Sequence, residues 1–119
     1  MKRDMDLVRT ILLTVEEKGP PRGFMQLDLP GYDPETVSHH VLLLGEAGLL
    51  EVLNRKLLNY FEVMPKCLTW AGHEFLDAAR NDTVWNKAKE VVKEKGGAIP
   101  FEVLKVLLTK LASSVFGVG

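Results

Sequence analysis

The side chains that could do chemistry are three histidines, one cysteine and the carboxylates near them. His73 and Asp77 are four residues apart, so a helix would place them on one face, with Glu74 beside them. Such a group could act as an acid/base pair or as part of a metal site. A hydrogen bond at the helix surface, or pairing of the carboxylates with Arg80, explains the same spacing without catalysis. We therefore predict no catalytic residues.

The other histidines and the cysteine carry a weaker signal. His39 and His40 are adjacent, so on a helix they point about 100° apart and are poorly placed to grip one metal ion. We expect His40 to pack at the edge of the core and His39 to be exposed. Cys67 has no neighbour in the sequence that would activate a thiolate, so we expect a half-buried strand residue. We predict no metal site and no cofactor.

Two tryptophans, Trp70 and Trp85, flank a predicted helix and the start of the next one. Stacking on nucleic-acid bases would require them to be exposed beside cations. Both are next to apolar helix positions, so we predict that both are core residues.

Composition restricts the class of protein. The chain has 119 residues, of which 46% are hydrophobic, and this fits one compact domain with an appended helical hairpin. The net charge of −1 is less basic than that of most non-specific nucleic-acid binders. A single cysteine forms no internal disulfide, so we expect a reducing compartment, the cytoplasm. Charged residues interrupt the apolar run at the start of the sequence and argue against a signal peptide, and we expect no membrane span.

The stretch 33–50 organises the rest of the chain. It predicts a helix with Asp33 as N-cap, Pro34 at the first helical position and Gly48 as a left-handed ending, followed directly by a strand. The helix contains no Lys or Arg, and Glu35 and Glu46 lie on its outer side. Its inner face should be formed by residues at helical spacing, namely Val37, Val41, Leu44 and Gly48.

The neighbouring segments predict a small sheet and one more helix around this one. The first helix should span residues 3–18, with Asp4 as its cap. Alternation over residues 24–29 predicts a short third strand. Strands at 50–53 and about 60–68 should form a hairpin whose turn carries Arg55 and Lys56.

Three further helices should follow the hairpin. Thr69 is the expected N-cap of the first, Asp82 that of the second, and Pro100 opens the third, which runs to about residue 116. Because the last helix has a wide apolar face and a narrow polar strip, we expect it to dock on the domain or to form a homodimer. The expected dimer contacts are Leu104, Leu107, Leu108, Leu111 and Val115.

Three stretches, MKRDMDLVRTILLTVEE, HHVLLLGEAGLLE and LTWAGHEFLDAARNDTVWNKAK, together cover most of the chain. They resemble domain of unknown function family 2513, a group of small bacterial and prophage-associated proteins. The resemblance implies a winged-helix-like fold and a bacterial or phage origin, and it supplies no catalytic or ligand-binding residues. Association with mobile elements favours a regulatory role by analogy.

We therefore predict an α+β protein, with a winged-helix-like domain at residues 1–80 and a helical hairpin at 81–119 that docks or dimerises. The expected function is a non-enzymatic regulatory module. Two partners remain open: DNA, bound by a transcriptional regulator, or a regulatory protein, bound by an adaptor that keeps the fold without binding DNA. For DNA, the expected groove-facing residues are Thr36, His39 and Leu43, and the expected phosphate contacts are Arg55, Lys56 and Lys66.

Overall fold

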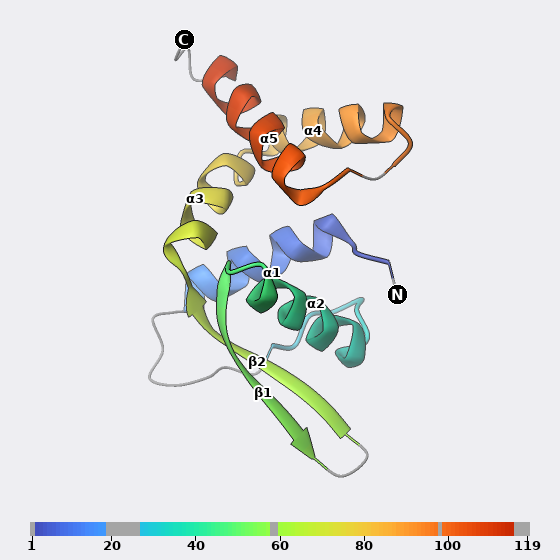
Figure 1. Ribbon diagram of the computed structural model, residues 1–119, viewed down its shortest axis with the longest axis vertical. Helices are drawn as coiled ribbons and strands as arrows, with labels where there is room; N and C mark the ends of the chain where they lie inside the picture. Colours follow the sequence, from blue (N-terminus) through green and yellow to red (C-terminus); the bar gives the residue numbers. More distant parts are fainter. Residues whose placement is uncertain (1, 19–26, 58–59, 98, 116–119) are drawn as a thin grey trace. The chain divides into compact units, whose positions relative to one another are not determined.

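The computed structural model describes residues 2–18, 27–57, 60–97 and 99–115, without the side chains of residues 54–57, 60–62 and 115 (Figure 1). The chain divides into two compact units, residues 1–73 and 74–119. The boundary falls inside a helix, between His73 and Glu74, whereas the sequence had suggested a boundary after residue 80. Each unit is described on its own.

The first unit is built from two helices and a hairpin, and it ends in the first turn of a third helix. Its elements are α1 (Met5–Lys18), α2 (Pro34–Glu46), β1 (Leu50–Leu57), β2 (Tyr60–Leu68) and the start of α3 (Trp70–Ala79). The two strands are antiparallel, from Leu50 opposite Leu68 to Leu57 opposite Tyr60, with one irregularity between Glu51 and Val52. α1 and α2 pack against each other, and both contact the hairpin.

The hairpin strands are longer than predicted. β1 continues to Leu57, so Arg55 and Lys56 lie within the strand and not in the turn. Polar residues suggested a turn here, but ladder hydrogen bonds join backbone groups, and strands at a sheet edge commonly carry charged side chains. The predicted third strand is wrong for residues 27–29, which have no regular structure, and residues 24–26 lie outside the described residues. The described part of the sheet has two strands.

The start of α2 follows the predicted positions but not the predicted hydrogen bond. Asp33 is the N-cap, with extended backbone angles (φ −67°, ψ 136°), and Pro34 begins the helix. The Asp33 carboxylate, however, makes no capping hydrogen bond. The Asp33 carbonyl instead accepts from the N–H of Val37 at 3.0 Å, which is the first hydrogen bond of the helix. The backbone geometry set by proline is therefore enough to begin α2 here.

α2 ends as its sequence predicts, because Gly48 adopts φ +80°. The Gly48 N–H donates to the Gly45 carbonyl (3.1 Å), and the Leu49 N–H donates to the Leu44 carbonyl (2.9 Å). This pair of bonds is a Schellman motif, which satisfies the last carbonyls of the helix and turns the chain toward the next element. The turn leads directly into β1 at Leu50.

The predicted apolar side of α2 is confirmed for Val37, Val41 and Leu44, which are all buried. It is wrong for Gly48, which is exposed and lies beyond the last residue of the helix. α1 is capped by Asp4, as predicted, because its carboxylate accepts from the Leu7 N–H at 3.1 Å. α1 then contributes five buried side chains to the core of this unit: Leu7, Val8, Ile11, Leu12 and Val15.

The second unit comprises the rest of α3 together with α4 (Asp82–Glu94) and α5 (Phe101–Val115), which pack against each other. The predicted cap of α4 is wrong by one residue: Asn81 is the N-cap, and its side-chain oxygen accepts from the Val84 N–H at 3.1 Å. Asp82 is the first helical residue, where its charge favours the positive end of the helix. The fully or nearly covered side chains of this unit are Phe75, Leu76, Ala79, Val84, Trp85, Ala88, Leu104 and Leu108.

The apolar face of α5 is split between covered and open residues. Leu104 and Leu108 are buried, whereas Val103 and Val106 are exposed. In α4, Val91 and Val92 are half-buried. None of the helices in the described part of the chain reaches the length and hydropathy needed to cross a membrane.

Candidate interaction site at the start of α3

The first residue of α3, Trp70, is 81% exposed. The prediction that both tryptophans lie in the core is therefore correct for Trp85, which is 2% exposed, and wrong for Trp70. An indole in water is unusual, because tryptophan is highly buried on average. Trp70 is therefore a large apolar side chain that the described part of the first unit leaves open to solvent.

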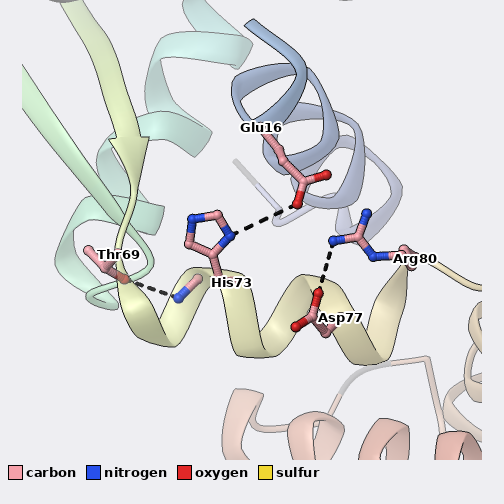
Figure 2. Close-up of polar contacts among 6 residues, drawn as sticks. Glu16, Thr69, His73, Asp77 and Arg80 are labelled. Carbon is pink, nitrogen blue, oxygen red and sulfur yellow. Dashed lines mark hydrogen bonds and ion pairs between the residues drawn. The ribbon is translucent and has the colours of Figure 1, made fainter. Parts of the chain in front are cut away.

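Thr69 holds the backbone beneath Trp70 in place. Its hydroxyl accepts from the Gly72 N–H at 3.0 Å, as the predicted N-cap should (Figure 2). It also donates to the Gly48 carbonyl. The Thr69 N–H donates to the Leu49 carbonyl at 3.0 Å. One of these three hydrogen bonds closes the first turn of α3, and the other two join it to the residues that follow α2. The backbone at the base of the exposed indole is therefore held in place.

Gly72 explains why the start of α3 lies so close to that connection. A Cβ atom on this residue would lie 2.1 Å from the Leu49 carbonyl oxygen and 3.3 Å from Cδ2 of Leu68. Gly72 is buried, while Trp70, two residues earlier, is open to solvent. Positions i and i+2 of a helix point in different directions, so contact at Gly72 leaves the side of Trp70 free.

His73 and Asp77 have different partners, so the structure gives no support to an acid/base pair. His73 Nδ1 lies 3.9 Å from Glu16 Oε2, and Asp77 accepts from the Arg80 guanidinium at 2.9 Å (Figure 2). The His73 side chain is 52% exposed and that of Asp77 is 70% exposed. Exposed pairs of this kind contribute little to stability. The described residues contain no group of three potential metal ligands.

His40 is more deeply buried than predicted, with an exposed fraction of 0%. Its Nε2 accepts from the Asp4 N–H (2.8 Å), and its Nδ1 donates to the Thr36 carbonyl (2.8 Å). The Asp4 amide can only donate, so these contacts select the neutral tautomer with the proton on Nδ1. His40 therefore fastens the residues before α1 to α2, and both of its ring nitrogens are engaged. His39, expected to be exposed, is half-buried.

The candidate DNA contacts do not form a cationic surface in the described residues. Thr36, His39 and Leu43 are half-buried, and the exposed positions of α2 include Glu35 and Glu46. Lys66 lies half-buried on β2; the side chains of two further candidates are outside the described residues, namely Arg55 and Lys56. Residues 1–73 contain eight Lys or Arg against ten Asp or Glu, a net charge of −2.

Cys67 is a half-buried strand residue, as predicted. Its thiol donates to Glu51 Oε2 at 3.0 Å. This hydrogen bond, followed by partial burial and by the charge of Glu51, raises the pKa of Cys67 above its ordinary value. A raised pKa leaves less thiolate at neutral pH, so Cys67 is a poor nucleophile.

The expected dimer contacts on α5 are not equally available to a partner. Leu104 and Leu108 are 5% and 0% exposed, so the chain itself already covers them. Leu107 and Leu111 are half-buried, and the side chain of Val115 lies outside the described residues. The open apolar side chains of α5 are Val103 and Val106, at 52% and 55% exposed.

The exposure of Trp70 can be predicted from its neighbours on the helix, although not from its residue type. On a helix the neighbours of position 70 are positions 73, 74 and 77, which here are His73, Glu74 and Asp77. All three are exposed in the structure. A tryptophan whose helical neighbours are all polar belongs to the solvent face, so the helical spacing predicts the exposure of Trp70 correctly.

Comparison with known proteins identifies a family and a bacterial relative. The model of a family described as "Hypothetical protein (DUF2513)" matches residues 2–98. A Haemophilus influenzae protein named "Uncharacterized protein" is 41% identical over 116 residues, covering 97% of this chain and 98% of the relative. No solved structure matches significantly.

Proposed function

The chain belongs to the DUF2513 family, and from this premise we propose that it is a non-enzymatic regulatory module that binds a partner protein through Trp70. The observation that carries the proposal is the 81% exposure of an indole beside a residue, Thr69, whose hydroxyl and amide make three hydrogen bonds. Tryptophan is among the residues that most often dominate the binding energy of protein interfaces. Its large area and few rotatable bonds make contact at low entropic cost.

The proposed architecture of the first unit is winged-helix-like. α2 takes the place of the helix that commonly enters the DNA groove, and the β1–β2 hairpin takes the place of the wing. The packing of α1, α2 and the hairpin on one another supports this arrangement. Residues 27–33, which precede α2, form no helix, so in the described residues no helix is joined to the start of α2 by the short turn of a helix-turn-helix.

Charge favours a protein partner over DNA. Phosphate contacts by Lys and Arg supply most non-specific DNA affinity, and the net charge of residues 1–73 is −2. α2 has no cationic residue, while Glu35 and Glu46 are exposed on it. A surface of this kind repels phosphate, but it leaves an exposed indole free to bind an apolar pocket on another protein.

Site-specific photo-crosslinking in a bacterial host tests the proposal. A photoreactive phenylalanine replaces Trp70 in one variant and Lys87, an exposed residue of α4, in a matched control. We expect position 70 to yield a discrete protein adduct, identified by mass spectrometry, that is absent from the control. The isolated partner should then bind wild-type protein at least about tenfold more tightly than Trp70→Ala. Equal binding by the two proteins would refute the role of Trp70.

DNA binding remains the second candidate, favoured by the three cations of the hairpin, Arg55, Lys56 and Lys66. Binding to mixed-sequence DNA across a salt series tests it. For this candidate, affinity should fall steeply as salt is added, and Arg55→Glu with Lys56→Glu should abolish binding while Lys87→Glu should not. Absence of binding even at low salt would eliminate it.

A further inference from the structure

α5 carries an exposed stripe that the described part of the chain leaves uncovered. Val103 and Val106 are 52% and 55% exposed, far above the 5% and 0% of Leu104 and Leu108 on the inner side. The remaining exposed residues of the stripe are polar. We define the α5 stripe as Glu102, Val103, Val106, Thr109 and Lys110.

The charges of the α5 stripe are arranged symmetrically about Val106. Glu102 lies four residues before it and Lys110 four residues after it, so all three are on one side of the helix. Among the described residues, neither Glu102 nor Lys110 forms an ion pair within the chain. The stripe therefore has a negative end, an apolar centre and a positive end.

We propose that the α5 stripe binds the same stripe of a second copy of this chain, with the two helices antiparallel and a twofold axis near Val106. A twofold axis makes each surface its own complement. Here it places Glu102 of each copy opposite Lys110 of the other, and Val106 opposite Val106. Val103 of each copy then faces Thr109 of the other. The two Glu102–Lys110 ion pairs lie on either side of this apolar centre.

Charge selects the antiparallel arrangement. A parallel pairing would place the two Glu102 carboxylates together and the two Lys110 ammonium groups together, and like charges in contact are unfavourable. Because Leu104 and Leu108 are covered within the chain, they cannot supply the contact expected from sequence. One helical stripe with two valines is a small interface, so the dimer is weak and forms only as concentration rises.

Reversing the charges of the stripe tests the arrangement, with sedimentation velocity measured from about 1 µM to about 500 µM. Each of Glu102→Lys and Lys110→Glu turns two attractive pairs into repulsive ones and should raise the dimer Kd about tenfold. The double variant Glu102→Lys/Lys110→Glu restores opposite charges across the axis and should return the Kd to within about threefold of the wild type. Val106→Asp should abolish the dimer.

Lys87→Glu, which changes an exposed charge on α4, is the matched control and should leave the Kd unchanged. Circular dichroism and thermal unfolding establish that each variant is folded, and all substituted side chains are exposed. A wild-type protein that stays monomeric throughout, or a dimer that survives both Val106→Asp and the single charge reversals, would overturn the proposal. So would a double variant that stays as weak as the single ones. Trp70→Ala should not affect the dimer, so this result is independent of the proposed function.

Discussion

The two tryptophans of this protein have opposite surroundings, although each lies near the start of a helix. Trp70 opens α3 and is 81% exposed, while Trp85, in the first turn of α4, is 2% exposed. Helical spacing joins Trp85 to Ala88, Lys89 and Val92, which are buried, exposed and half-buried. It joins Trp70 to exposed polar residues. The other residues on the same side of the helix therefore decide whether an aromatic side chain is part of the core or is free to contact a partner.

The largest expected effect is a difference between the two tryptophans in how much each stabilises the protein. Trp85→Ala removes a fully covered indole and should lower the free energy of unfolding by about 3 to 5 kcal/mol. Trp70→Ala removes an exposed one and should change it by no more than about 0.5 kcal/mol. Urea unfolding followed by circular dichroism measures both. If the two variants lost equal stability, Trp70 would have to be buried and the proposed interaction site would be lost.

The next effect concerns the contact that fixes the base of Trp70. Gly72→Ala would place its Cβ against the Leu49 carbonyl oxygen and should destabilise the protein by about 1 to 3 kcal/mol. Alanine is favoured over glycine in a helix by about 1 kcal/mol, so propensity alone would give the opposite sign. Gly45→Ala, which meets only the side chain of Val52, is the matched control and should cost less. A more stable Gly72→Ala protein would contradict the close packing of α3 on the end of α2.

A smaller effect is expected at the cap itself. Thr69→Ala should lower the free energy of unfolding by about 1 kcal/mol, because the Gly72 N–H and the Gly48 carbonyl both lose their partner. Thr69→Ser keeps the hydroxyl and should retain most of that stability. Thermal unfolding of the two variants and of Trp70→Ala compares the contribution of Thr69 to stability with that of the exposed Trp70 next to it. Equal losses for Ser and Ala would show that the hydroxyl makes no contribution.

The smallest effect is on reactivity, close to the same site. Glu51 raises the pKa of Cys67, so Glu51→Gln should lower it and increase the fraction of thiolate at pH 8. We expect iodoacetamide to label Cys67 severalfold faster in that variant, with little change in stability. In the wild type, the protonated Cys67 thiol stabilises the fold at pH values below its ordinary pKa of 9.0. This contribution to stability is lost as the pH rises through the raised pKa. Faster labelling of the wild type than of the variant would contradict the hydrogen bond.

The sequence was a good guide wherever the cause of a feature lies within a few residues. The position of Asp33, the start at Pro34, the ending at Gly48 and the cap at Thr69 were all predicted correctly. In each case a cap hydrogen bond, a fixed proline φ or a positive glycine φ determines the geometry locally. The cap of α4 was displaced by one residue, because Asn81 and Asp82 are both suitable caps and the sequence does not rank them.

The predictions that were wrong concern features that depend on residues far away in the sequence. The length of β1 is set by pairing with β2, so the polar residues at 54–56 did not end the strand. His40 was expected at the core edge, but its burial depends on the Asp4 amide, 36 residues away. The availability of Leu104 and Leu108 likewise depends on what covers them, and a helical apolar face does not reveal whether its own chain or another copy does so.

The hydroxyl of Thr69 has two backbone partners of opposite kind. One is the carbonyl of Gly48, two residues after the end of α2, and the other is the amide of Gly72 in the first turn of α3. Aspartate ranks at least as high as threonine as an N-cap, but its carboxylate has no proton for the carbonyl and would repel it. The side chain at residue 69 must therefore donate one hydrogen bond and accept another. Aspartate, although a strong N-cap for an isolated helix, would be a poor choice at this position.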